Sequence, residues 1–356
     1  MLLFFVLLIA VGYLAERWSM NHALDGVSHR HFPDRHTVEP EESFSLITEM
    51  TNASRRFVPF VRLRETIPGA LTVLEEGLSL SPPQEGKQVM TSSLYLMPRQ
   101  KWQRSLRCSL PQRGRYVFQG ASLQGGDFLG VSETVSYQSE QAEIIVIPAR
   151  CAQPGLAETV GGFLGERSVN RFLMEDPVLT LGFREYTGRE PMKNISWTQS
   201  ARMSRLMVKN FDYTLEPKAT VLLNVQTAHT EGWQQRLEHC FSLARTVCEM
   251  LEEQKIQFRF LTNADAAGFL THWNTLEDGM SQSHLNSILE GLGRATYDTL
   301  RPFDAILERA ARSAEQGRTH ILILPEQDPA HQEGIRRLEL LSGAKVLVLS
   351  AEEVYA

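Results

Sequence analysis

Ala219-Thr-Val-Leu-Leu-Asn-Val-Gln226 is a short, mostly apolar run in the C-terminal part of the chain. A run of this length is typical of a buried strand. Leu237, Phe241 and Leu251 then follow on one stripe at helical spacing, which indicates an amphipathic helix. Because parallel strands need long crossover connections, this alternation predicts a mostly parallel sheet covered by helices over residues 219–356.

Strands and helices continue to alternate along the rest of this half. We expect strands at Ile256–Thr262, Thr319–Leu324 and Lys345–Leu349, and helices at Leu285–Leu300, Phe303–Gln316 and Ala330–Leu341. In sheets of this kind a ligand binds at the carboxyl ends of the strands. That edge is therefore a candidate site.

Residues 27–150 show a different pattern, with short segments in which apolar and polar residues alternate. The clearest segments are Phe44–Met50, Trp102–Leu110, Arg115–Gln119 and Glu143–Ile147. Glycine or proline separates them, and no long amphipathic helix interrupts them. The pattern predicts an antiparallel β-sandwich of immunoglobulin type, so the whole chain is expected to be an α+β multidomain protein.

The N-terminal residues predict a membrane anchor over residues 1–20. Met1–Ala15 is uncharged and apolar, but fifteen helical residues span only about 22 Å of a hydrocarbon core about 30 Å thick. The helix must therefore thin the bilayer or pair with another segment, and a cleaved signal peptide is the alternative. Arg17, Arg30 and Arg35 follow the run, which predicts a single-pass protein of the cell membrane with cytoplasmic soluble domains.

The composition excludes several classes of protein. The 356 residues predict two or three domains. Lys and Arg together number 36 against 42 Asp and Glu, so the net charge of -6 gives no basic excess for nucleic acid. The four cysteines lack the CxxC spacing of zinc knuckles, and we expect no cofactor.

Other candidate motifs carry weaker signals. His22, His29, His31 and His36 could bind zinc or copper, but no Cys or acidic spacing accompanies them, and a solvated strand is the favoured interpretation. Gly161-Gly-Phe-Leu-Gly165 is not followed by the lysine of a phosphate-binding loop, so we expect a flexible loop there. No G-x-S-x-G elbow occurs in the sequence.

The most distinctive segment is Gly182-Phe-Arg-Glu-Tyr-Thr-Gly-Arg-Glu-Pro-Met-Lys-Asn-Ile-Ser-Trp-Thr-Gln-Ser-Ala-Arg202. It closely resembles the signature of the bacterial domain-of-unknown-function family fifty-eight. The residues that carry this resemblance are Arg184, Glu185, Tyr186, Gly188, Trp197, Ser200, Ala201 and Arg202. Arg113-Gly-Arg-Tyr116 and Gly126-Asp-Phe-Leu-Gly130 also resemble family motifs, although Phe128 replaces a proline.

The resemblance implies an order of domains and a partner. It implies a membrane anchor, a β-rich domain, a connecting segment at 151–218 with the signature, and a von Willebrand factor A-like domain at 219–356. Members of the family commonly accompany MoxR-type AAA+ ATPases. The resemblance therefore implies an ATPase of this type as the partner.

Von Willebrand factor A domains hold a divalent metal through an Asp-x-Ser-x-Ser loop, because a hard cation needs converging carboxylate and hydroxyl oxygens. Here the corresponding residues are Asn224, Gln226 and Ala228. The carboxylate and both serines are gone. We therefore predict a scaffold domain whose metal site has been lost.

The signature segment suggests two roles. Residues 182–218 carry seven basic and four acidic groups with aromatic residues between them, which could bind an acidic partner. The favoured alternative is that Arg184, Glu185 and Arg202 pair internally and brace the joint between the domains, with Trp197 as a core anchor.

The functional hypothesis is a membrane-anchored interaction or scaffold protein. It would work with a MoxR-type AAA+ ATPase in the assembly or maturation of a membrane or envelope complex, without an identifiable small-molecule substrate. The alternative is an envelope-associated hydrolase-like enzyme that uses Glu185, Tyr186 and Arg202 near the signature.

Overall fold

The computed structural model describes residues 24–75, 77–126, 133–171, 180–188, 192–211, 218–268, 273–315, 317–343 and 345–351. The expected anchor at residues 1–20 lies outside these ranges, as do His22, residues 127–130 and Arg189. No helix in the described part of the chain is both long and apolar enough to cross a bilayer. The chain divides into two compact units, Met1–Ala149 with Leu292–Arg294, and Arg150–Gly291 with Ala295–Ala356.

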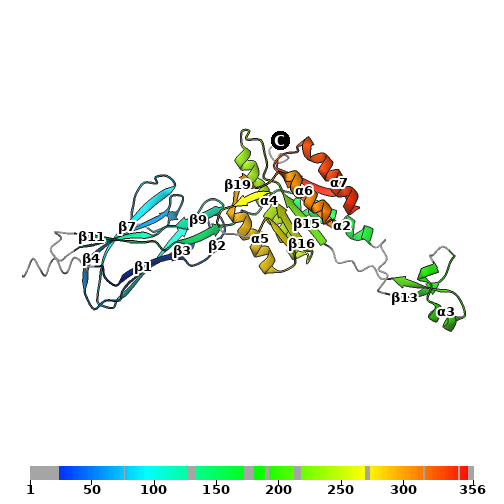
Figure 1. Ribbon diagram of the computed structural model, residues 1–356, viewed down its shortest axis with the longest axis horizontal. Helices are drawn as coiled ribbons and strands as arrows, with labels where there is room; N and C mark the ends of the chain where they lie inside the picture. Colours follow the sequence, from blue (N-terminus) through cyan, green and yellow to red (C-terminus); the bar gives the residue numbers. More distant parts are fainter. Residues whose placement is uncertain are drawn as a thin grey trace, which may run out of the picture. The chain divides into compact units, whose positions relative to one another are not determined.

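The regular elements described in residues 24–149 of the first unit are β-strands (Figure 1). They are β1 (Val27–Pro33), β2 (Thr37–Val38), β3 (Phe44–Asn52), β4 (Val58–Pro68), β5 (Thr72–Val73), β6 (Ser79–Leu80), β7 (Lys87–Leu96), β8 (Lys101–Ser109), β9 (Gly114–Phe118), β10 (Ala121–Gly126), β11 (Glu133–Gln138) and β12 (Ala142–Val146). They form three sheets in the orders β1-β3-β8-β5, β11-β10-β4-β7-β6 and β2-β12-β9. All the pairs are antiparallel except β12 with β2.

Two of these sheets pack face to face. Residues of β3 are alternately buried and half-buried along its length, as the period of two predicts. Met50 of β3 lies in one apolar cluster with Leu63 of β4 and Leu123 of β10, which belong to the facing sheet. The expected antiparallel sandwich is therefore confirmed. Its assignment to the immunoglobulin type stays a prediction.

The second unit contains a five-stranded sheet in the order β18-β16-β15-β20-β21. Its parallel strands are β15 (Lys218–Leu223), β16 (Gln257–Thr262), β20 (Thr319–Leu324) and β21 (Val346–Ser350), and β18 (Thr275–Gly279) is an antiparallel edge strand. The helices are α2 (Leu156–Arg171), α3 (Trp197–Met203), α4 (Trp233–Glu253), α5 (Gln282–Arg294), α6 (Phe303–Arg312) and α7 (Gln332–Ser342). The shorter elements are β13 (Thr180–Glu185), β14 (Met207–Phe211), β17 (Ala264–Ala266), β19 (Ala295–Thr299), η1 (Met192–Asn194) and η2 (Pro329–His331).

The parallel strands are buried because helices cover the sheet, which explains their continuous apolar runs. Every residue of β20 is buried. Leu237, Phe241 and Leu251 lie on the buried side of α4, as their spacing predicts. Phe303 of α6 lies in one apolar cluster with Leu222 of β15.

Several expected elements have different limits in the structure. The helix expected at Phe303–Gln316 ends at Arg312. The helix expected to reach Leu300 ends at Arg294, because the β-branched and aromatic residues of Ala295–Thr299 form β19 and pair with β17. Gly161–Gly165 is not a loop but lies within α2, whose Leu156 and Val160 are buried. The strand expected over Ala219–Gln226 is β15, which ends at Leu223. The Asn224 side chain accepts a hydrogen bond from the Gln226 amide, and the chain turns there.

Candidate functional site

The signature segment folds as a small hairpin with a helix between its strands. β13 pairs with β14 in antiparallel fashion, and η1 and α3 lie between them in the sequence. Gly188 has a φ of 86°, which favours glycine at the turn, and α3 ends where Ser204 takes the left-handed conformation. The Tyr186 amide donates to the Leu206 carbonyl at 2.8 Å and closes the hairpin.

Ser200 joins α3 to β14. Its Oγ donates to the Ser196 carbonyl at 2.8 Å and accepts from the Met207 amide at 2.9 Å. The Ser196 amide in turn donates to the Met207 carbonyl. Ile195 and Val208 are buried beside these bonds. Among the signature residues, Ser200 therefore has a structural role within the hairpin.

Other signature residues are exposed. Trp197 is 62% exposed, so the prediction of a core anchor is wrong. Arg202 and Ala201 are exposed on α3. Glu185 pairs with Arg205 at 3.3 Å rather than with Arg202, and both partners of that pair are more than half exposed. The prediction that Glu185 pairs with Arg202 is therefore also wrong, because the Glu185 carboxylate forms its ion pair with Arg205.

We use the name signature surface for the exposed apolar and basic side chains of this hairpin, taken together. It combines large apolar residues with basic ones: Phe183, Met192, Trp197, Met203 and Leu206, with Arg184, Lys193, Arg202, Arg205 and Lys209. Within residues 180–188 and 192–211, five side chains are basic and Glu185 alone is acidic. The surface is therefore apolar and positively charged at once.

At the carboxyl edge of the parallel sheet, the side-chain amides of Asn224 and Asn263 form hydrogen bonds with each other and with the backbone. Asn224 Oδ1 accepts from the Gln226 amide and from Asn263 Nδ2, both at 2.8 Å, and Asn263 Oδ1 accepts from the Val225 amide at 2.9 Å. The Ala228 amide donates to Glu326 at 2.9 Å. The residues at the positions of the metal loop are thus engaged in hydrogen bonds with one another and with the neighbouring strand ends.

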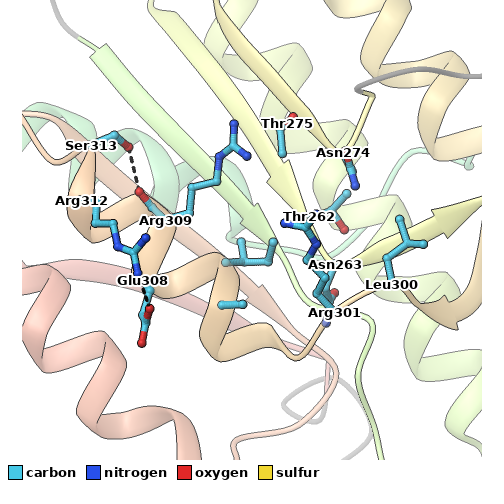
Figure 2. A pocket seen from close by; sticks show the side chains of 12 residues that line it. Thr262, Asn263, Asn274, Thr275, Leu300, Arg301, Glu308, Arg309, Arg312 and Ser313 are labelled. Atoms are coloured by element: carbon cyan, nitrogen blue, oxygen red, sulfur yellow. Dashed lines mark hydrogen bonds and ion pairs between the residues drawn. The ribbon is translucent and has the colours of Figure 1, made fainter.

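A cleft of about 710 Å³ lies at the carboxyl end of β16 (Figure 2). Its lining comes from the end of β16, the start of β18, the segment before α6 and α6 itself: Thr262, Asn263, Asn274, Thr275, Leu300, Arg301, Ala305, Ile306, Glu308, Arg309, Arg312 and Ser313. Glu308 accepts a hydrogen bond from Arg312 at 2.9 Å. Three arginines against one carboxylate suit a polar or anionic group, and the lining includes no histidine or cysteine that could serve as a base or nucleophile.

A third polar group lies inside the first unit. His29 and His31 are 3% and 4% exposed and face inward from β1, so the prediction of a solvated strand is wrong for these two residues. His29 Nε2 lies 3.2 Å from Glu65 Oε1. Thr48 Oγ1 donates to the same oxygen at 2.7 Å, and Arg104 Nη2 donates to Oε2 at 2.6 Å. Burial raises the pKa of Glu65, but the contacts of these four side chains outweigh it and lower that pKa to about 2.

The sequence analysis did not identify Glu65 and Arg104 as neighbours of these histidines. Glu65 and Arg104 are separated from the histidines and from each other by long stretches of chain. The alternation of Val27, His29 and His31 on one face of a strand was the available signal, since it places both imidazoles beside a core residue.

Comparisons with known proteins found structural similarity but no match by sequence. No protein family matches the sequence, and no curated protein matches it. Among solved structures, the chain is similar to AvmM, which catalyses macrocyclization in alchivemycin A biosynthesis, with 12% identity over 34% of this chain and 89% of that chain and a TM-score of 0.25. It is also similar to a type II cohesin domain from the cellulosome of Acetivibrio cellulolyticus. The sequence identity is 13%, the match covers 33% of this chain and 94% of the cohesin chain, and the TM-score is 0.26. The CARDB domain of the PF1109 protein from Pyrococcus furiosus is similar as well, with 12% identity and a TM-score of 0.23. That match covers 35% of this chain and 90% of the CARDB chain.

Proposed function

We propose that this protein is a membrane-anchored interaction protein that binds an acidic face of a partner protein through the signature surface. The partner is a MoxR-type AAA+ ATPase, as the family resemblance implies, and the complex serves the assembly or maturation of a membrane or envelope complex. The observation that carries the proposal is the 62% exposure of Trp197 in a hairpin whose exposed charged side chains are mostly basic.

The composition of the signature surface supports a protein partner. Trp and Arg are enriched among the residues that dominate binding energy in protein interfaces, and the signature surface contains both residue types. Arg202 and Arg205 at its basic part would attract an acidic face and orient it. Arginine can also bind a carboxylate through two parallel hydrogen bonds.

The second unit serves in this proposal as a von Willebrand factor A-like scaffold. The parallel sheet supports this assignment, and the hydrogen bonds of Asn224 with Gln226 and Asn263 support a scaffold without Mg²⁺. A hard cation needs a carboxylate at this position, and a carboxamide engaged in three hydrogen bonds is a poor substitute.

No observation favours the hydrolase-like alternative. Glu185 is held by Arg205 at the surface, and Arg202 is exposed. An acid-base pair needs side chains that converge on one reacting atom. Instead, Glu185 and Arg205 form an exposed ion pair, and Arg202 is exposed to solvent.

In the same proposal both units lie on the cytoplasmic side of the membrane. Arg30 and Arg35 follow the apolar N-terminal run, which agrees with the positive-inside rule. Added protease should leave both units intact in whole cells and digest them in inverted vesicles. Digestion in whole cells would contradict this orientation.

The docking proposal is tested by affinity measurements between the full chain in mild detergent and a purified MoxR-type ATPase from the same organism. Trp197→Ser and Arg202→Glu should each weaken binding at least tenfold, and higher salt should weaken the wild-type complex. The matched controls are Leu340→Ser and Arg337→Glu, which change exposed residues of α7.

The controls separate docking from a general effect on the surface. They should leave both affinity and melting temperature unchanged. Equal loss in the controls, or full binding by both signature variants, would contradict a role for the signature surface. Binding that fails for wild type with every ATPase of this type would refute the partner.

A further inference from the structure

We propose that His29, His31 and Glu65 bind a divalent transition-metal ion of the zinc class inside the first unit, independently of the docking function. One ligand atom from each of the three residues lies within 4.8 Å of the other two. All three residues are buried, with exposed fractions of 3%, 4% and 0%. Such a site would be shielded from solvent by the sandwich around it.

The separations between the ligand atoms fit tetrahedral coordination. Zinc bonds to imidazole nitrogen and carboxylate oxygen are about 2.0 to 2.1 Å long, which places two ligands of one tetrahedral ion about 3.3 Å apart. His29 Nε2 lies 3.2 Å and His31 Nδ1 lies 3.4 Å from Glu65 Oε1. Both distances therefore match an edge of the coordination tetrahedron.

His31 supplies a second, independent observation. Its side chain is only 1% exposed, and neither ring nitrogen forms a hydrogen bond of normal geometry, although Nδ1 lies 3.4 Å from Glu65 Oε1. Leaving a buried polar atom unsatisfied destabilises a folded protein. Its Nδ1 faces the Glu65 carboxylate, so an ion between them would satisfy that atom.

Neighbouring side chains hold Glu65 in the orientation that a ligand needs. Arg104 engages Oε2 at 2.6 Å and leaves Oε1 directed at the histidines, where Thr48 also donates at 2.7 Å. Hydrogen bonds of this kind orient the carboxylate ligands of metal sites. The positive charge of Arg104 weakens binding of every cation, so the nitrogen ligands must supply the affinity.

The position of the group in the fold indicates what the ion would do. His31, Thr48 and Arg104 lie in one cross-strand row of β1, β3 and β8, whereas Glu65 comes from β4 of the facing sheet. An ion bound here would link the two sheets and fasten the edge strand β1. Imidazole and carboxylate ligands favour zinc or cobalt over Mg²⁺ and Ca²⁺.

The test uses the full chain without a histidine tag, refolded in mild detergent with Co²⁺ as a spectroscopic probe. Wild type should bind about one ion per chain, show the visible absorption of tetrahedral cobalt, lose it to added Zn²⁺, and melt at a higher temperature with either ion. His29→Gln and His31→Asn, which keep an amide near each ligand atom, should bind at least tenfold more weakly. His36→Gln, at an exposed histidine of the same unit, should bind as wild type does.

Two other outcomes of the binding experiment would overturn the proposal. Wild type without tetrahedral absorption, or binding retained in both ligand variants, means that no ion binds at this place. A cluster that responds to pH but not to metal is a protonation site instead. If the variants fail to fold, X-ray absorption on wild type decides, because two imidazoles with oxygen support the site and sulfur ligands refute it.

Discussion

Arg318 donates two parallel hydrogen bonds to Asp278, from Nη1 to Oδ1 at 2.7 Å and from Nη2 to Oδ2 at 2.6 Å. The Arg318 side chain is fully buried, and its Nη1 also donates to the Ala219 carbonyl at 3.1 Å. One guanidinium therefore joins the edge strand β18 to β15 just before β20 begins. This planar two-pronged contact is one that lysine could not reproduce.

Asp278→Asn should lower the free energy of unfolding by about 2 to 3 kcal/mol, because it removes the main partner of a buried cation. The loss stays below that of a completely unpaired charge, since Glu315 still lies 3.1 Å from Arg318. Urea denaturation followed by circular dichroism measures it. Glu308→Gln is the control, because its exposed pair with Arg312 should contribute under about 0.5 kcal/mol. Equal losses in the two variants would contradict the prediction.

The contribution of Asp278 should depend on pH. Burial raises its pKa, but the hydrogen bonds from Arg318 and the charges of Arg318, Arg259 and Lys218 together hold that pKa below its usual value. The stabilisation is therefore complete above the unfolded value of about 3.9 and is lost as the pH falls towards the folded one. Urea midpoints of wild type and Asp278→Asn should differ at pH 7 and 5 and converge below about pH 4. A gap that stays constant to pH 3 would count against this.

Thiol reactivity should single out one cysteine. Burial raises the pKa of Cys108 to about 12 and also raises the pKa values of Cys240 and Cys248. The thiolate is the reactive form, so these three should resist maleimide at pH 8 until the protein unfolds. Cys151 is half-buried and should react first. Mass spectrometry of the native labelled chain checks this, and Cys151→Ser should abolish native labelling. Rapid native labelling of Cys240 would refute it.

Ser200→Ala and Arg202→Ala should act differently although both lie on α3. Loss of the Ser200 hydroxyl leaves the Met207 amide without its acceptor, so hydrogen exchange at that amide should speed up at least tenfold. Arg202 is exposed, and its removal should leave exchange unchanged within twofold. Exchange that speeds up in both variants would mean that Arg202 stabilises the hairpin after all.

The alternation patterns of the sequence predicted the elements that depend on local chemistry. The period-two pattern at β3 and the helical stripe of α4 gave the correct types of structure, because a side chain's face follows from backbone geometry alone. The predicted ends of helices and strands were less accurate where a contact with a distant part of the chain determines them. Pairing of β19 with β17 shortened the expected helix, since a strand partner 29 or more residues away is invisible in a local pattern.

A β-rich part, a parallel sheet with helices and a segment dense in charges and aromatic residues could all be predicted from residue patterns. Which of those side chains contact one another depends on the folded arrangement of the strands. Glu65 contacts His29 across 36 residues of sequence and Arg104 across 39, while Glu185 selects Arg205 instead of Arg202. Backbone periodicity fixes the face on which a side chain lies, but the partner of a buried or charged group depends on which strands the fold places opposite each other.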